Sequence, residues 1–211
     1  MAKIEPFEQF THRYEQWFEK YYYTYISEVE AVKKLLPSGK GIEIGVGSGR
    51  FSVPLGIKFG VEPSLKMGKI SKQKGIYVVR AAAEYLPVKD RSFDFVLLVT
   101  TICFVDDIEK TLKETGRILK KDGNVVIGFI DKNSPLGKFY QKNKEKNPFY
   151  RYAQFYSTEE VVSFLRKTGF GKFSFVQTVF DLPENIKEIQ PVKKGYGKGS
   201  FVVIRAQRIE M

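Results

Sequence analysis

GIEIGVGSGR, the stretch from Gly41 to Arg50, joins a short apolar strand to a glycine-rich loop. Ile42 and Ile44 have the spacing of buried strand residues, and glycines follow at positions 45, 47 and 49. Glycine accepts a positive φ and lets another molecule approach the backbone closely, because it has no Cβ. A strand that runs directly into three alternate glycines predicts a ligand-binding loop.

Two phosphate-binding loops are the first alternatives for this stretch. A dinucleotide site of the GxGxxG type needs its third glycine at position 50, where the chain has Arg50. A P-loop needs GxxxxGK followed by Ser or Thr, and no such run occurs in the sequence. Neither motif is met, so the remaining interpretations are another ligand or a plain turn that needs small residues.

Strands and helices alternate along the chain on both sides of this loop. An aromatic helical pattern runs from Phe7 to Leu36, as two helices or a kinked one. After the loop, residues 51–56 predict a short helix interrupted by Pro54, and the nearly all-apolar segment from Phe93 to Val99 is typical of a central strand. Further strands are predicted at 57–61, 76–80, 124–130, 171–180 and 200–207, and helices at 65–73, 107–119 and 157–168.

This order predicts an α/β fold with a doubly wound, mostly parallel, seven-stranded sheet and helices on both faces. Ligands of such sheets bind beyond the carboxyl ends of the strands, where the glycine loop, Glu62 and residues 81–86 all fall. A carboxylate at the position of Glu62 suits a ribose diol. The alternative is an acid that only begins a helix and faces solvent.

Composition and charge narrow the class of protein. The 211 residues are 43% hydrophobic and 28% charged, as in a globular protein. No window approaches the roughly 18 apolar residues of a membrane span, and the start MAKIEPFEQF lacks a signal-peptide core, so we expect a cytoplasmic protein. The single cysteine, Cys103, excludes an internal disulfide and cannot build a zinc site. The formal charge of +11 could attract an acidic substrate or nucleic acid, but the basic residues are scattered.

Further motifs follow the glycine loop in order: VEPS after the second strand, AAAEYLPVKDRSFDFVLL, LKETGRILKKDGNVVIG and FYSTEEVVSFLRKTGF. Together with EIGVGSGR they resemble the class I S-adenosylmethionine-dependent methyltransferases, and within them the methyltransferase type 11 group similar to the ubiquinone and menaquinone biosynthesis enzymes. The likeness covers residues 41–170. It implies a Rossmann-like fold and S-adenosyl-L-methionine as the cofactor.

The resemblance also implies where the cofactor binds. Glu43 takes the acidic position at the end of the first strand, the glycine loop passes beneath the methionine part, and Glu62 holds both ribose hydroxyls. Residues 83–84 lie beside the adenine, and Leu98 offers its carbonyl to the cofactor's amino group. A sulfonium carries no phosphate, so acids and backbone groups suit it. The implied set is Glu43, Gly45, Gly47, Ser48, Gly49, Glu62, Pro63, Ala83, Glu84 and Leu98.

Several residues near the expected sites of the adenine and the methyl acceptor depart from the family pattern. Ala82 stands where many relatives have aspartate, and Cys103 and Phe104 stand where many have two histidines, so no general base is carried over. The aromatic N-terminal segment could cover the pocket. Candidate catalytic residues are His12 and Tyr14, and candidate acceptor-binding residues are Tyr14, Trp17, Tyr22 and Phe104.

The predicted function is in-line methyl transfer to a small-molecule acceptor, driven mainly by positioning. We expect one domain, acting as a monomer or homodimer, with an N-terminal helical cap (1–37), a cofactor-binding half (38–131), a lid or insertion (132–156) and a C-terminal helix and strands (157–211). An RNA or other nucleic-acid methyltransferase is the first alternative, although LLVTTICFV lacks the proline-containing motif of enzymes that methylate base amino groups. A dinucleotide-dependent oxidoreductase and a non-catalytic cofactor-binding protein are the others.

Overall fold

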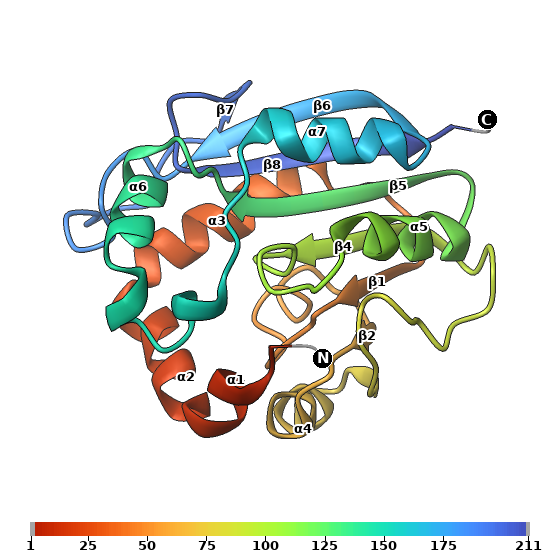
Figure 1. The fold of residues 1–211 in the computed structure, drawn as a ribbon, viewed down its shortest axis with the longest axis horizontal. Coiled ribbons are helices and arrows are strands. Elements are labelled where there is room, and N and C mark those ends of the chain that lie inside the picture. Colours follow the sequence, from red (N-terminus) through yellow and green to blue (C-terminus); the bar gives the residue numbers. More distant parts are fainter. Residues whose placement is uncertain (1–2, 210–211) are drawn as a thin grey trace.

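The computed structural model describes residues 3–209, which form one mixed β-sheet with helices on both faces (Figure 1). The strands lie in the order β3-β2-β1-β4-β5-β8-β6-β7; the first five are parallel, and the last three join antiparallel. The predicted α/β sheet is confirmed, with eight strands instead of seven because Lys193 and Lys194, in the connection between β6 and β8, pair with β6. The strands are β1 (Gly41–Ile44), β2 (Phe59–Val61), β3 (Tyr77–Val79), β4 (Phe93–Val99), β5 (Leu119–Ile130), β6 (Phe170–Thr178), β7 (Lys193–Lys194) and β8 (Phe201–Arg208).

The helices correct the sequence prediction at two places. The aromatic N-terminal segment forms three helices, because the backbone leaves helical angles at Phe10 and Tyr21. Residues 51–56 form consecutive turns, since Pro54 has no N–H to donate and Gly56 takes a φ of 70°. The helices are α1 (Glu5–Gln9), α2 (Thr11–Lys20), α3 (Tyr22–Leu35), α4 (Leu65–Gln73), α5 (Ile108–Ile118), α6 (Pro135–Lys142) and α7 (Thr158–Lys167), with 3-10 helices η1 (Lys144–Lys146) and η2 (Tyr150–Tyr152).

Apolar side chains of β4 alternate between two cores, as the period of a strand requires. Val96 and Leu98 pack in the core with α5 and α7, whereas Phe95, Leu97 and Val99 pack in the core with α3. Figure 1 accordingly shows α3 on the opposite face of the sheet from α5 and α7. Because both faces are covered, the carboxyl ends of the parallel strands are the place left for a ligand.

Helices α1 and α2, which precede the sheet in the chain, and α6, which follows β5, gather at those carboxyl ends (Figure 1). In Figure 1 the arrowheads of β4 and β5 point toward the side of the molecule that holds α1, α2 and α6. α1 also contacts α4, and α2 contacts α3, so the N-terminal helices bridge the two sides of this edge. None of the helices in residues 3–209 combines the length and the apolar character needed to cross a membrane.

Candidate functional site

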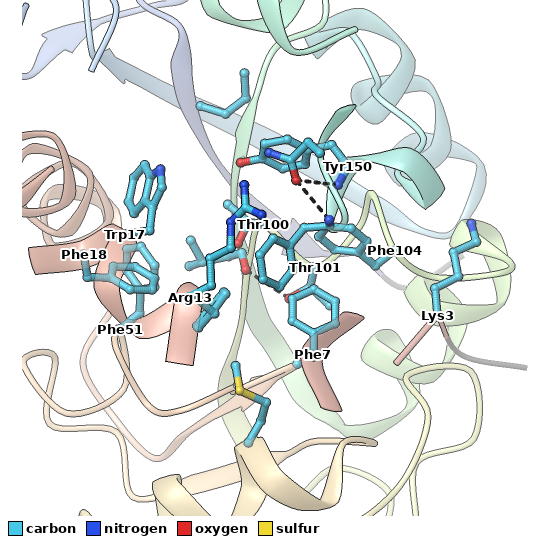
Figure 2. Close-up of a pocket in the computed structure, with 18 of the residues that line it drawn as sticks. Lys3, Phe7, Arg13, Trp17, Phe18, Phe51, Thr100, Thr101, Phe104 and Tyr150 are labelled. Atoms are coloured by element: carbon cyan, nitrogen blue, oxygen red, sulfur yellow. Dashed lines mark hydrogen bonds between the residues drawn. The ribbon is translucent and has the colours of Figure 1, made fainter. Parts of the chain in front are cut away.

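A cavity of about 800 Å³ opens at the carboxyl ends of β1, β2, β4 and β5. Its lining includes the glycine loop, the ends of these strands, α1, α2, part of α3, and residues of the segment 139–150. Figure 2 shows Phe7, Thr101 and Phe104 around the cavity, with Trp17 and Phe18 to one side. The volume is that of an ordinary small-molecule site. Within residues 3–209, no cluster of three His, Cys, Asp or Glu side chains could hold a metal ion.

The glycine loop presents part of its backbone to this cavity. Gly45 and Gly47 line it with φ of 70° and 53°. A Cβ on Gly45 would come within 2.5 Å of Thr101 Oγ1, whereas one on Gly47 would meet only Tyr14 Oη at 3.5 Å and Met67 Cε at 3.7 Å. Gly49 does not line the cavity, because its missing Cβ points toward Ile76 Cδ1 at 2.7 Å. Two of the three predicted glycines therefore face the ligand space, and the third permits packing behind it.

Glu62 is held in place at the end of β2 by two backbone donors. Its carboxylate accepts from Gly47 N and from Ser64 N, each at 2.8 Å, and its side chain lines the cavity next to Pro63. Burial raises the pKa of Glu62 to about 7, and the two backbone hydrogen bonds oppose that rise. Each carboxylate oxygen keeps a further lone pair. Glu62 is thus a positioned acceptor that can take two more hydrogen bonds from a ligand diol.

Glu43 lies behind the cavity, outside its lining. The side chain is buried, and Oε2 accepts from Ser52 Oγ at 2.5 Å. Burial raises the pKa of Glu43 to about 8. Through its hydrogen bond with Ser52, Glu43 links the end of β1 to the turns that follow the glycine loop.

The end of β4 meets the cavity one residue later than predicted. Leu98 is fully buried in the core of α5 and α7 and does not line the cavity, whereas Val99, Thr100 and Thr101 do. Two threonines directly after an apolar strand were the sequence signal that could have predicted this part of the lining. Ala83 and Glu84 line the cavity as expected, and the Glu84 carboxylate accepts from Asp106 N at 2.7 Å.

The acceptor-side candidates separate into two groups. Tyr14, Trp17 and Phe104 line the cavity. His12 and Tyr22 are exposed and do not, and His12 Nε2 lies 3.4 Å from Gln16 Nε2 on the outer surface of α2. Residues two apart on a helix point to opposite sides, which explains why Tyr14 faces inward when His12 faces outward. Burial raises the pKa of Tyr14 far above its ordinary value, so its hydroxyl stays protonated above the glycine loop.

Glu28 is a cavity residue that the sequence prediction missed. It lies in the middle of α3 with 4% of its surface exposed, and it lines the part of the cavity that Ile130, Tyr140 and Tyr150 also line. Burial raises the pKa of Glu28 to about 8. α3 also carries the exposed Glu30, so no sequence signal sets Glu28 apart from it; the packing of α3 on β5, β8 and β6 turns Glu28 inward.

Glu28→Gln is expected to stabilise the ligand-free protein at alkaline pH. The Glu28 carboxyl has a folded-state pKa of about 8 against an ordinary value of 4.5, so between these values the folded protein holds a proton that the unfolded chain has lost. Stability of the wild type therefore falls across that interval, and the neutral variant lacks this contribution. Tyr140 and Tyr150, which face Glu28, have pKa values raised by burial and stay neutral throughout.

Urea unfolding at intervals from pH 4.5 to pH 9 measures this difference. The advantage of the variant in free energy of unfolding should be smallest near pH 4.5 and largest above pH 8. A difference that stays constant across the range would contradict the assignment of a buried, uncompensated carboxyl to Glu28.

Glu15 connects α2 to the glycine loop. Its carboxylate pairs with Arg50 Nη2 at 2.6 Å, accepts from the Ser48 hydroxyl, and lies 3.6 Å from Lys74 Nζ. Ser48 is buried by this contact and does not line the cavity. The carboxylate of a second glutamate, Glu8, accepts from Ser64 Oγ at 2.7 Å and links α1 to the start of α4. The N-terminal helices are therefore fixed over the loop by charged hydrogen bonds.

Glu15→Ala is expected to lower the free energy of unfolding by about 1–3 kcal/mol, because it leaves Arg50 and Ser48 without their acceptor in a half-buried position. Glu19→Ala is the matched control, since Glu19 is on the same helix, lies 4.0 Å from Arg50 Nη2 and is 74% exposed. An exposed pair of this kind contributes about 1 kcal/mol or less. Urea unfolding of both variants tests the contact, and equal losses would contradict it.

Comparison with known proteins agrees with this geometry. A family model for a methyltransferase domain matches residues 42–127. The chain is similar to an S-adenosylmethionine-dependent methyltransferase, possible histamine N-methyltransferase, of Thermotoga maritima, with 55% identity, a TM-score of 0.96, and coverage of 97% of this chain and 99% of that chain. An uncharacterized protein of Methanocaldococcus jannaschii is 42% identical over 98% of this chain and all of its own length. A ubiquinone/menaquinone biosynthesis C-methyltransferase of Campylobacter jejuni is 30% identical over 53% of this chain and 57% of its own.

Proposed function

This chain belongs to the class I S-adenosylmethionine-dependent methyltransferases, and we propose that it transfers a methyl group to a small-molecule acceptor bound in the cavity. The observation that carries the proposal is the continuity of the cavity, which extends from the glycine loop and Glu62 to the aromatic residues of α2 and the segment 139–150. One end has the groups that suit the cofactor. The other has an apolar, aromatic lining with space for a second molecule.

The residues at the first end fit S-adenosylmethionine. We assign Glu62 to the ribose diol, because its carboxylate is fixed by two backbone donors and still has free lone pairs. We assign Gly45 and Gly47 to the methionine part, since they leave backbone exposed to the cavity. Ala83 and Glu84 are proposed to flank the adenine. Glu43 supports this end from behind. For the backbone carbonyl that binds the amino group of the cofactor, residues 99–101 are candidates beside Leu98, because they line the cavity.

The bound cofactor supplies a methyl group on a positively charged sulfur, and transfer leaves the carbon–sulfur electron pair on sulfur while the acceptor atom contributes the pair of the new bond. The protein's part is to hold the acceptor beside that group and to exclude water. Tyr14 and Phe104 line the cavity with Phe7, whose ring centroid lies 5.8 Å from that of Tyr14 and 5.1 Å from that of Phe104. The described part of the lining contains no histidine. We therefore propose that positioning supplies most of the rate enhancement.

A small acceptor is supported by the chemistry of the lining. Aromatic rings and a few convergent polar groups are typical of small-molecule sites. A nucleic-acid substrate would require a basic track, and among residues 3–209 the basic residues of the lining are Lys3, Arg13 and Lys20. The Thermotoga relative's description names an N-methyltransferase, so nitrogen is the acceptor atom that we would test first.

Methyl transfer from S-adenosylmethionine labelled in its methyl group tests the proposal. Separate reactions would contain a panel of small amines, phenols and thiols, or total RNA. We expect label in members of the small-molecule panel and none in RNA. Label confined to RNA would contradict the small-molecule assignment and support the nucleic-acid alternative.

A further inference from the structure

The far end of the cavity, defined by Glu28, Ile130, Tyr140 and Tyr150, contains a carboxylate with no partner. Glu28 is buried, and no hydrogen bond or ion pair within residues 3–209 engages its carboxylate. Its oxygens are not sealed in the core, since Glu28 lines the cavity and has no fully enclosed unpaired atom. The side chain is therefore aimed into space that a ligand can fill.

The sheet order places this carboxylate away from the cofactor residues. Glu62 and the glycine loop follow β2 and β1, whereas α3 packs on β5, β8 and β6 on the other side of β4. The residues between them, Val99 to Thr101 and then Ile130, line the cavity at the ends of β4 and β5. A molecule bound against Glu28 thus lies in the same cavity as the cofactor, on its acceptor side.

Aromatic rings surround the far end. The ring centroids of Tyr140 and Tyr150 are 4.5 Å apart, and Phe149, the residue before Tyr150, also lines the cavity. Both tyrosine hydroxyls are neutral at physiological pH, because burial raises their pKa values. Aromatic faces attract a cation within about 6 Å of the ring centroid. Neutral rings beside the buried Glu28 carboxyl form a pocket that is complementary to a positive group, and the exposed Glu184, which also lines the cavity and acts on Tyr140, adds to its acidic character.

A buried carboxylate without a partner is unfavourable for the ligand-free protein. In a structural role it would be expected to have a buried cation or several hydrogen-bond donors, as Glu62 and Glu15 have. Glu28 has neither. A ligand that carries the missing cation removes this cost on binding, because the pair forms out of water where it is strongest.

Three basic residues also line the cavity, and they are poorly placed to pair with the Glu28 carboxylate. Arg13 and Lys20 are exposed, and Lys20 Nζ lies 5.1 Å from the ring centroid of Tyr21. Lys3 is half-buried, and Figure 2 shows it on the opposite side of the cavity from Trp17 and Phe18. Charges in contact with solvent are screened. The Glu28 carboxyl is shielded from solvent and, with its raised pKa, protonated at neutral pH in the ligand-free protein, and a cation bound beside it favours the ionised form. The interior of the far end is therefore acidic.

We propose that Glu28 binds the protonated amino group of the methyl acceptor, and that the acceptor is a small amine with a second, neutral nucleophilic atom, such as a ring nitrogen or a phenol oxygen. This inference rests on the proposed function. An ammonium nitrogen has no lone pair, so the atom that receives the methyl group is a different, neutral atom of the same molecule. The contact with Glu28 makes and breaks no covalent bond; it sets which molecules bind and how they are oriented.

Calorimetric titration of the S-adenosylhomocysteine complex tests the proposal. The probes are histamine, tyramine and tryptamine, each compared with the analogue in which a hydroxyl or a carboxylate replaces the amino group. We expect at least one amine to bind about 100-fold more tightly than its alcohol and its acid, because a desolvated charge pair is lost in both analogues. Methyl transfer to the same amine should be detectable with labelled cofactor.

Glu28→Gln isolates the contribution of the charge. It should weaken binding of that amine roughly 100-fold and leave affinity for the alcohol analogue and for S-adenosylhomocysteine unchanged. The matched control is Glu30→Gln, since Glu30 is two residues away on α3, exposed, and paired only with Lys33 at 3.9 Å among the described contacts. Removal of a buried carboxylate is not expected to prevent folding, and thermal melting of each variant checks this.

The possible failures have different meanings. Amines that bind no better than their alcohols, tighter binding of the acids, or an unchanged amine affinity in Glu28→Gln would each overturn the proposal. Failure of the whole panel to bind a protein that does bind S-adenosylhomocysteine would also overturn it. Failure to bind S-adenosylhomocysteine would instead overturn the cofactor site on which the proposed function depends.

Discussion

Glu62→Ala is expected to weaken binding of S-adenosylhomocysteine by about 100-fold or more. The substitution removes a carboxylate that we assign to two ribose hydroxyls, and each hydrogen bond to a charged group contributes about 1.5–3 kcal/mol. It also releases the backbone of the glycine loop, because Gly47 N and Ser64 N lose their acceptor. Isothermal titration calorimetry measures the affinity directly.

A comparison variant separates loss of the ligand contact from loss of the fold. Glu159→Ala removes an exposed carboxylate from the first turn of α7, outside the cavity lining. Its affinity for S-adenosylhomocysteine should equal that of the wild type. If Glu62→Ala melts cooperatively and still binds with wild-type affinity, the assignment of Glu62 to the ribose is wrong.

Gly45→Ala is expected to lower the free energy of unfolding by about 2–4 kcal/mol and the melting temperature by roughly 5–15 °C. Two costs combine. The backbone at Gly45 has a φ of 70°, which alanine adopts unfavourably. The new Cβ would lie 2.5 Å from Thr101 Oγ1 and 2.6 Å from Thr101 Cγ2, so the end of β4 has to move.

Gly56→Ala provides a close control for the first of these costs. Gly56 also has a φ of 70°, but a Cβ there would meet nothing within 4 Å. It should lose only about 1 kcal/mol, the cost of the backbone conformation. Differential scanning calorimetry compares the two variants. Equal losses would show that the contact between the glycine loop and Thr101 does not constrain the site.

The fold was predictable from the sequence because its signals are local. The parallel strands centre on short apolar runs, β4 is apolar over Phe93–Val99 apart from Asp94, and the glycines mark the turn after β1. The parallel arrangement then follows from alternation with helices. Helix boundaries in the aromatic N-terminal segment were less predictable, since Phe10 and Tyr21 fit a helical pattern even though the backbone breaks there.

The cofactor end of the site was largely predictable for the same reason. Gly47 and Glu62 lie at fixed positions after their strands, and the structure brings them into contact through a hydrogen bond. The carbonyl contact of Leu98 with the cofactor stays a prediction; Leu98 itself is outside the lining, because a strand pattern fixes which side chains are buried but not where the backbone reaches the cavity. Val99 and the two threonines after it take that place.

The acceptor end depends on tertiary packing and was only partly predictable. His12 was a candidate because of its chemistry, but the face of α2 that packs inward carries Tyr14 and Trp17. Glu28 was not a candidate, because nothing in its local sequence distinguishes it from an exposed helix residue. Its significance comes from the cavity that α3 and the segment 139–150 enclose together.

Titration of the purified wild-type protein with S-adenosylhomocysteine, with NADH as the control ligand, tests the central claim most directly. We expect one molecule of S-adenosylhomocysteine to bind per chain in the micromolar range, and no heat of binding for NADH, because Arg50 stands where a dinucleotide loop needs its third glycine. A clear NADH isotherm without binding of S-adenosylhomocysteine would contradict the cofactor site, and with it the proposed methyl transfer.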